Sequence, residues 1–147
     1  MGNAIDESES VSLADELRPI LLRLARHLRS EIPATGLTAG QIAILVAIEF
    51  NPGMTSQKLA DREGLSAAGV SGHLARLEGK GLIRRERTGD GRRVALTLSP
   101  AGRDAIELVR RERTRWLQGR IELLTPAERE QVRACLQALD RISMGDR

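Results

Sequence analysis

The chain has 147 residues, of which 41% are hydrophobic and 29% are charged. These proportions predict one compact globular domain and exclude a disordered or collagen-like chain. The longest apolar run, Ile42–Ile48, is far shorter than the roughly 18 residues that a membrane-spanning helix needs. The N-terminus also lacks the basic and apolar pattern of a secretion signal, so we expect a cytoplasmic protein with no membrane partner.

Scarce residue types exclude several classes of site. Cys135 is the only cysteine, which excludes an intramolecular disulfide and a multi-thiolate zinc site. The only histidines are His27 and His73, so we expect no metal and no cofactor. The only aromatic residues are Phe50 and Trp116, which argues against a site that stacks single-stranded bases on aromatic rings. The net charge of +3 permits an anionic partner, and if that partner is nucleic acid the composition favours duplex.

The N-terminal part is predicted to be a flexible tail followed by a helix. Residues 1–10 carry three acidic residues and little to bury. From Ser12 onward, leucine and isoleucine recur at spacings of three and four with arginines between them, which predicts an amphipathic helix. Ser12 and Asp15 indicate a capping box at its start. Pro19 either bends this helix or lies in its first turn, and a loop is expected over residues 31–37.

Capping residues and apolar runs predict three further helices. The first begins at Thr38, which forms a capping box with Gln41, and its run Ile42–Ile48 is apolar all round, as is typical of a central helix. The other two are separated by a turn at Gly64. Their expected ranges are 55–63 and 66–79.

The segment over residues 58–78 has the spacing of a helix–turn–helix. A small residue at the turn, Gly64, lets the two helices approach at a steep angle. The N-terminal half of the second helix then projects and can enter a major groove about 12 Å wide. Such pairs also occur as plain packing units, so this spacing alone leaves DNA binding and packing both open.

After Gly81 the hydrophobic period changes from 3.6 to 2, which predicts a β-hairpin over residues 82–98. The residues expected to face one side of it are Val94, Leu96 and Leu98. Five arginines and two acids lie between residues 84 and 93, a local charge of +3 that equals the net charge of the chain. Arginines beside a glycine-containing tip suit insertion of a guanidinium into a narrow minor groove, whereas the alternative is a solvated charged hairpin.

Two more helices are expected after the hairpin. Ser99 and Pro100 form an N-cap followed by proline in the first helical position, and they open a long helix. Thr125 and Pro126 repeat this pattern of an N-cap followed by proline, and Thr125 forms a capping box with Glu128. The apolar stripe of this last helix is Val132, Cys135, Leu136, Leu139 and Ile142. The arginines of the long helix at positions 110, 111, 113 and 115 are interpreted as a solvated face. The expected fold class is mainly α with a small β-hairpin wing.

These motifs make the sequence similar to the MarR family of bacterial winged-helix transcriptional regulators over roughly Leu13 to Ile142. The resemblance is carried by LTAGQIAILVAI (37–48), LADREGLSAAGVSGHLARLEGKGLI (59–83) and TGDGRRVALTLSPAG (88–102). In the last of these, the family's Asp-x-Arg and Leu-x-Leu-Ser-x-x-Gly elements are filled by Asp90, Arg92, Leu96, Leu98, Ser99 and Gly102.

The resemblance implies an obligate homodimer in which the first and last two helices interlock and two winged lobes bind a palindromic operator in duplex DNA. It implies a transcriptional regulator, expected to be a repressor, whose release a small-molecule effector could trigger. The implied organisation is a tail (1–10), an N-terminal dimerisation helix and loop (11–36), a DNA-binding domain (37–99) and C-terminal dimerisation helices (100–147). The residues expected at the dimer interface are Leu13, Leu17, Trp116, Val132, Leu136, Leu139 and Ile142.

Site residues follow from the family's motif positions. The leading part of the recognition helix is expected to present Ser66, Ala67, Ala68, Ser71 and Gly72, with Arg76 one turn further along. Arg92 is the expected minor-groove residue, oriented by Asp90 through a charge-assisted hydrogen bond. The phosphate-contact candidates are Arg84, Arg85, Arg87, Arg93, Thr55, Ser56 and Gln57. Relatives often carry Arg, Thr or Asn where this chain has Ala67, Gly69 and Gly72, so few donors are expected to face the bases.

Two other functions stay open at this stage. The winged helix could serve protein contacts, with the hairpin meeting an acidic partner. A thiol-based oxidant sensor of the same fold would use Cys135, although a free cysteine on an apolar stripe more often packs as a small hydrophobe. His73 is expected to be a half-buried structural residue and His27 to lie on the surface. No catalytic motif is found, so we do not expect an enzyme.

Overall fold

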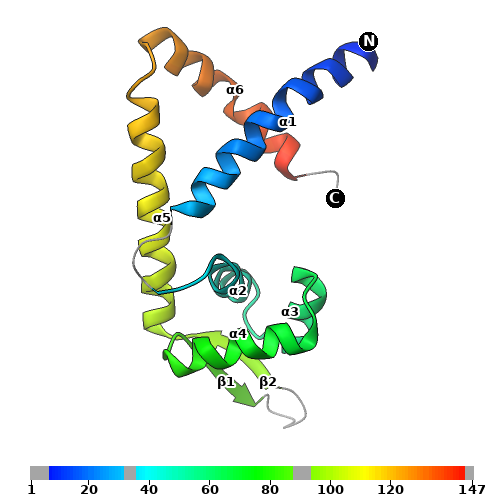
Figure 1. The fold of residues 1–147 in the computed structure, drawn as a ribbon, viewed down its shortest axis with the longest axis vertical. Coiled ribbons are helices and arrows are strands. Elements are labelled where there is room, and N and C mark those ends of the chain that lie inside the picture. The colour runs from blue at the N-terminus through cyan, green and yellow to red at the C-terminus, as the bar shows by residue number, and fades with distance from the viewer. Residues whose placement is uncertain (1–6, 32–35, 88–93, 145–147) are drawn as a thin grey trace. The chain divides into compact units, whose positions relative to one another are not determined.

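The computed structural model describes residues 7–31, 36–87 and 94–144. These residues form six helices and one antiparallel pair of strands (Figure 1). The elements are α1 (Glu7–Ser30), α2 (Ala39–Phe50), α3 (Ser56–Glu63), α4 (Ala67–Gly79), β1 (Ile83–Arg87), β2 (Val94–Leu98), α5 (Pro100–Ile121) and α6 (Pro126–Met144). The chain divides into two compact units, residues 1–113 and 114–147. Over the described ranges, no helix has the length and apolarity needed to cross a membrane.

α1 begins five residues earlier than the sequence predicts. Its first residue is Glu7 rather than Ser12, so the tail prediction is wrong for residues 7–10, while residues 1–6 lie outside the described range. The physical reason is that Glu7 and Glu9 stand in the first turn, where negative charge interacts favourably with the helix dipole. The acids that suggest a solvated tail are therefore also good helix-start residues.

Ser12 and Asp15 do not form a capping box, because both lie inside α1. The Ser12 hydroxyl donates to Glu16 at 3.4 Å instead. Asp15 accepts a hydrogen bond from Arg18 at 2.9 Å. Of the two possibilities left open for Pro19, the structure places it inside a helix that continues to Ser30.

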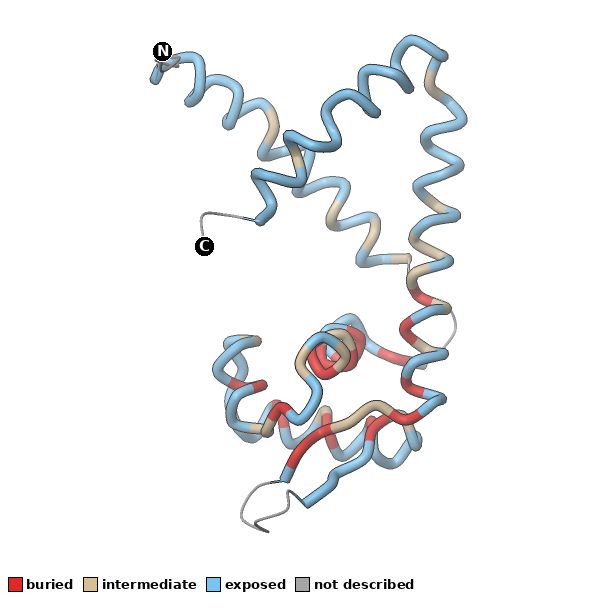
Figure 2. The backbone as a smooth tube through the Cα atoms, turned by 180° about the vertical axis from the view of Figure 1, so that it is seen from behind, coloured by how far each residue is buried: buried red, intermediate tan, exposed pale blue. Residues whose placement is uncertain are grey.

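The winged lobe consists of α2, α3, α4, β1, β2 and the start of α5, which share one hydrophobic core. α2 is its central helix, as predicted. Its capping box is confirmed: Gln41 N–H donates to Thr38 Oγ1 at 3.2 Å, and Thr38 N–H donates to Gln41 Oε1 at 2.9 Å. Buried residues are concentrated in α2, α3, α4, the strands and the start of α5 (Figure 2). The largest fully buried side chains are Ile44, Leu45, Ile48, Leu59, Leu74, Leu77, Ile83, Leu96, Ile106, Val70 and Val109. This core holds the helix–turn–helix rigidly.

The hairpin strands pair from Ile83 opposite Leu98 to Arg87 opposite Val94. Leu96 is buried, and its N–H donates to the carbonyl of Met54 at 2.9 Å, which ties β2 to the α2–α3 connection. Val94, Leu96 and Leu98, which are predicted to face one side of the hairpin, are alternate residues of β2 and differ in burial. Leu98 is half-buried, but Val94 is 40% exposed because β2 starts beyond the edge of the core. The expected turn at residues 88–91 lies outside the described residues.

Ser99 caps α5 and joins it to the end of α4. Its hydroxyl accepts from Gly102 N–H at 3.0 Å and donates to the carbonyl of Gly81 at 2.6 Å. The Ser99 N–H donates to the carbonyl of Leu82 at 3.0 Å. Ser99 itself is 4% exposed, and its bond from Gly102 is buried, whereas its bond to Gly81 is part-buried. The capping serine therefore also positions the strands.

The interpretation of the α5 arginines as a solvated face is wrong for two of them. Arg110 binds Glu49 of α2 and Glu107, and Arg113 donates to the carbonyl of Leu28. The cause is that the part of α5 up to Arg113 belongs to the same unit as α1 and α2, and these two arginines reach acceptors on both helices. In contrast, Arg111 is exposed and has no described partner.

α6 starts with the predicted capping box. The N–H of Glu128 donates to Thr125 Oγ1 at 3.3 Å, and the N–H and hydroxyl of Thr125 each donate to Glu128 Oε2 at 2.8 Å. The backbone hydrogen bond from Thr125, followed by the hydroxyl bond, lowers the pKa of Glu128 from its ordinary value of 4.5. No residue of α6 is buried.

Candidate nucleic-acid interface

The turn between α3 and α4 has the geometry that a helix–turn–helix requires. Gly64 ends α3 with φ of 63°, a left-handed conformation that glycine adopts without steric cost. The N–H of Leu65 donates to the carbonyl of Ala60 at 3.1 Å. Ser66 then caps α4, accepting a hydrogen bond from Gly69 N–H at 3.1 Å. Both predicted helices are confirmed, with the predicted last residues; each begins one residue after its predicted start, because Thr55 and Ser66 are the N-caps.

α4 has one buried face and one exposed face. Val70, Leu74 and Leu77 are buried, and Leu59 of α3 is buried with them in the same core. All six residues predicted for the recognition helix are exposed: Ser66, Ala67, Ala68, Ser71, Gly72 and Arg76. Each of the six is therefore accessible from outside the chain. Ser66 also has its hydroxyl oxygen engaged in the cap.

The leading part of the accessible side of α4, over residues 66–72, is made of small residues. A Cβ added to Gly72 would meet no atom within 4 Å, so packing within the chain does not require glycine there. A Cβ added to Gly69 would lie 3.1 Å from Ser66 Oγ, which is tight, so glycine at this position leaves room for the cap. Ala75 is also exposed, four residues after Ser71. The sequence prediction omitted it, although its spacing from Ser71 was the available signal.

The start of α3 carries the second group of predicted contacts. Thr55 is half-buried and caps the helix, accepting from Lys58 N–H at 3.3 Å. Ser56 is half-buried and Gln57 is exposed, with the Gln57 amide donating to Asp61 at 3.0 Å. Of the three predicted residues, Thr55 therefore has a clear structural role, and the other two are accessible to different degrees.

The three described arginines of β1 differ in their partners. Arg85 Nε lies 3.1 Å from Glu78 Oε2 at the end of α4, so this ion pair links the wing to the helix. Arg84 and Arg87 are exposed and pair with no acid among the described residues. Alternate strand residues point to opposite faces, so Arg85 and Arg87 share one face and Arg84 lies on the other. Asp90, Arg92 and Arg93 lie outside the described residues.

The residues considered for other roles lie as follows. His73 is half-buried against α2, where a Cβ added to Gly40 would lie 3.6 Å from its ring. Its Nδ1 is buried and has no hydrogen-bond partner among the described residues. His27 is exposed, as predicted. Cys135 is exposed, and its thiol donates to the carbonyl of Val132 at 3.1 Å. In the described ranges, no cluster of His, Cys, Asp and Glu could hold a metal ion.

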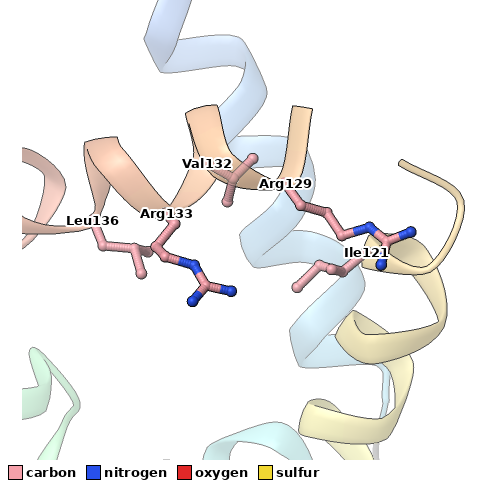
Figure 3. A pocket seen from close by; sticks show the side chains of 5 residues that line it. All are labelled: Ile121, Arg129, Val132, Arg133 and Leu136. Carbon is pink, nitrogen blue, oxygen red and sulfur yellow. The ribbon is translucent and has the colours of Figure 1, made fainter. Parts of the chain in front are cut away.

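The residues predicted for dimerisation lie on α1, α5 and α6. Leu13 is 63% exposed, Leu136 is 56% exposed and Ile142 is 62% exposed. Val132 is also exposed, whereas Leu17, Trp116 and Leu139 are half-buried. Within the C-terminal unit, a groove of about 370 Å³ runs between the end of α5 and α6 (Figure 3). Its lining residues are Ile121, Arg129, Val132, Arg133 and Leu136.

The described elements define a winged helix–turn–helix protein. The family model described as the MarR family matches residues 35–93. An uncharacterized HTH-type transcriptional regulator of Mycobacterium bovis is 30% identical over 123 residues, which are 83% of this chain and 86% of that protein. The chain therefore belongs to the MarR family of transcriptional regulators.

Solved structures agree with this assignment. A transcriptional regulator protein from Pseudomonas aeruginosa has a TM-score of 0.82 and 28% identity, covering 97% of this chain and 100% of that chain. A variant of Staphylococcus aureus MepR, determined bound to an oligodeoxyribonucleotide, has a TM-score of 0.68 and 22% identity, covering 86% of this chain and 94% of that chain. The mainly α fold with a hairpin wing is thereby confirmed.

Proposed function

We propose that this regulator binds a palindromic operator in duplex DNA as a homodimer and represses transcription in the cytoplasm. The accessible side of α4 enters the major groove, and the wing reaches the adjacent backbone and minor groove, with Arg92 as the minor-groove residue and Asp90 orienting it. Arg93 and the start of α3 add phosphate contacts. An effector that changes the distance between the two lobes would release the DNA, because each α4 must meet its own half-site.

One observation carries this proposal. The accessible side of α4 is free of unpaired acid: its one acidic residue, Glu78, binds Arg85 of the wing. Beside it, Arg84 and Arg87 have no acid partner among the described residues. Small side chains on α4 let the backbone approach the groove closely, and the arginines supply the charge that phosphates attract. The fold is shared with a MepR variant that was determined bound to an oligodeoxyribonucleotide, which supports DNA as the partner.

The composition of the accessible face indicates how sequence is read. A bidentate side chain contributes about 1–3 kcal/mol of base discrimination, and Arg76 is the only long donor among the predicted α4 residues. Ser71 can hydrogen-bond, and Ala67 and Ala68 can contact thymine methyl groups. We therefore propose that groove shape and deformability contribute a large share of the specificity.

A homodimer is supported by the apolar side chains that the single chain leaves exposed. α1 exposes Leu13, Ile20 and Leu24, and α6 exposes Leu136 and Ile142. The groove of the C-terminal unit adds an apolar lining bordered by Arg129 and Arg133 (Figure 3). Large apolar side chains left exposed on α1 and, separately, in the C-terminal unit favour a protein contact. A second copy of the chain is the partner that we propose for it.

The experiment is selection of duplexes from a random-sequence pool with the purified full-length protein, followed by footprinting of the selected duplexes. We expect a palindrome with half-site centres about 34–36 Å apart, or about 10 base pairs. Binding should weaken as salt rises, since arginine contacts release counterions. A winged helix used only for protein contacts would enrich no duplex and protect no palindrome, even at low ionic strength, and that result would reject the proposal.

The exposed thiol of Cys135 gives the oxidant-sensor alternative a direct test. The proposed regulator does not need this thiol, so Cys135→Ser should bind operator as the wild type does. In cells, the response of the regulated promoter to peroxide should also be the same with either protein. A peroxide response that disappears in Cys135→Ser would establish the sensor instead.

A further inference from the structure

Two arginines one turn apart on α5 bind groups from two other helices of the same unit. Arg110 donates through Nη1 and Nη2 to the two carboxylate oxygens of Glu49 near the end of α2, with Nη1–Oε1 at 3.3 Å, and it also contacts Glu107. Arg113 donates from Nε to the carbonyl oxygen of Leu28 in the last turn of α1 at 2.8 Å. These contacts are called the α5 joint below.

Each contact of the joint has a clear chemical basis. The hydrogen bonds to Glu49 and then Glu107 raise the pKa of Arg110 above its ordinary value, as expected where carboxylates bind a guanidinium. A guanidinium that meets both oxygens of a carboxylate also fixes their relative orientation. The carbonyl of Leu28 is one of the last four of α1, and such carbonyls receive no N–H donor from their own helix. The Nε–H of Arg113 is the donor that binds it.

The joint matters because packing alone does not fix α1. No residue of α1 is buried, and its half-buried residues are Leu17, Ala25 and Leu28. α2 differs sharply, since six of its twelve residues are buried in the winged lobe. Through α5, Arg110 and Arg113 therefore connect the element that is embedded in the lobe with the element that is not.

We propose that Arg110 and Arg113 are positioning residues that set the half-site spacing which the dimer accepts. This inference rests on the proposed function, in which α1 carries part of the dimer contact. From Leu28 to Leu13, α1 is about 22 Å long. A rotation of about 10° at the joint would move Leu13 by about 4 Å, which exceeds the roughly 3.4 Å rise of one base pair. If the contacts of the α5 joint hold α1 rigidly, the dimer binds only operators with one distance between half-sites. If these contacts are lost, the dimer accepts operators with different distances between half-sites.

The experiment compares duplexes that differ only in the spacer between half-sites. The probe is the palindrome selected from the random pool by the wild-type protein, with one base pair inserted or deleted at its centre. Wild type should lose at least tenfold in affinity for each changed duplex. In Arg110→Gln, Glu49→Gln and Arg113→Gln, that penalty should fall below about threefold. Arg111→Gln removes the same charge from the same helix without breaking a described contact, and it should keep the wild-type penalty.

A second measurement does not involve DNA. Cys135→Ser with Lys58→Cys places one spin label on α3 of each copy, and pulsed electron resonance gives the distribution of distances between them. Arg110→Gln should broaden this distribution, and Arg111→Gln should not. An unchanged distribution together with an unchanged spacer penalty would overturn the inference while leaving the proposed function intact. A wild type that selects no duplex would instead overturn the proposed function, and the inference with it.

Discussion

Gly102 lies so close to Leu82 that a Cβ on Gly102 would stand 2.1 Å from the Leu82 carbonyl oxygen. That oxygen cannot move freely, because it accepts the hydrogen bond from Ser99 N–H at 3.0 Å. We therefore expect Gly102→Ala to destabilise the protein by about 3 kcal/mol, the upper end of the usual range for overpacking. Chemical denaturation followed by circular dichroism measures the change.

The matched control for this prediction is Gly119→Ala in the same helix. A Cβ at Gly119 would meet nothing within 4 Å. The substitution should be neutral or stabilising, by at most about 1 kcal/mol, because alanine has the higher helix propensity. If Gly102→Ala were as stable as Gly119→Ala, the close approach to Leu82 would not constrain the fold.

Local interactions explain why much of the fold could be predicted from sequence. Thr38 with Gln41, the turn glycine Gly64 and the cap Ser66 each act over three or four residues, so their spacing is visible in the chain. The α5 joint was not predictable, because Arg110 and Glu49 are 61 positions apart and no periodicity connects them. From the sequence, these arginines are predicted to form a solvated helix face, which is the usual environment of charged residues on a helix.

In the candidate site, too, local features could be predicted from the sequence, and contacts between distant residues could not. The accessible positions of α4 followed from helical periodicity, and the structure confirmed their exposure. In contrast, the pairing of Arg85 with Glu78 depends on how β1 leaves the end of α4, a tertiary feature. A run of arginines in the sequence therefore did not indicate that one of them already has a partner.

The capping box of α6 should respond to pH. Because hydrogen bonds from Thr125 lower the pKa of Glu128 in the folded state, the cap stabilises the protein above the ordinary value of 4.5 and is lost as pH falls through the lowered pKa. Carbon-13 NMR of the Glu128 carboxyl should therefore titrate below 4.5. In Thr125→Ala the midpoint should rise towards the ordinary value. A midpoint at or above 4.5 in the wild type would contradict the cap.

Arg84 and Arg87, which pair with no acid among the described residues, should control the salt dependence of DNA binding. Each phosphate contact contributes about −0.9 to the slope of log affinity against log salt. Arg84→Ala and Arg87→Ala should each reduce the magnitude of the slope by about 0.9. Arg85→Ala should reduce it less, because Glu78 already engages this guanidinium. Fluorescence anisotropy at salt concentrations from about 50 to about 300 mM measures these slopes. Equal effects of all three substitutions would show that the ion pair between Arg85 and Glu78 does not affect DNA binding.

Arg92 is expected to matter more than any single wing arginine of β1. A guanidinium in the minor groove meets the deepest negative potential of the duplex. Arg92→Ala should weaken operator binding at least tenfold, or ~1.4 kcal/mol, while the dimer persists. Asp90→Asn should have a smaller effect, since it removes only the orienting charge. Unchanged affinity of Arg92→Ala for the selected duplex would mean that the wing does not contact DNA.

Leu136 offers the sharpest test of the dimer surface. In the single chain it is 56% exposed, so Leu136→Asp should alter the stability of an isolated copy by no more than about 0.5 kcal/mol. If a second copy covers it, the new carboxylate would be buried without a partner, and the dimer should dissociate. Light scattering at micromolar protein should then report 16.1 kDa. Phe50→Asp, at a residue 68% exposed outside the proposed surface, should stay dimeric, and a dimeric Leu136→Asp would place the interface elsewhere.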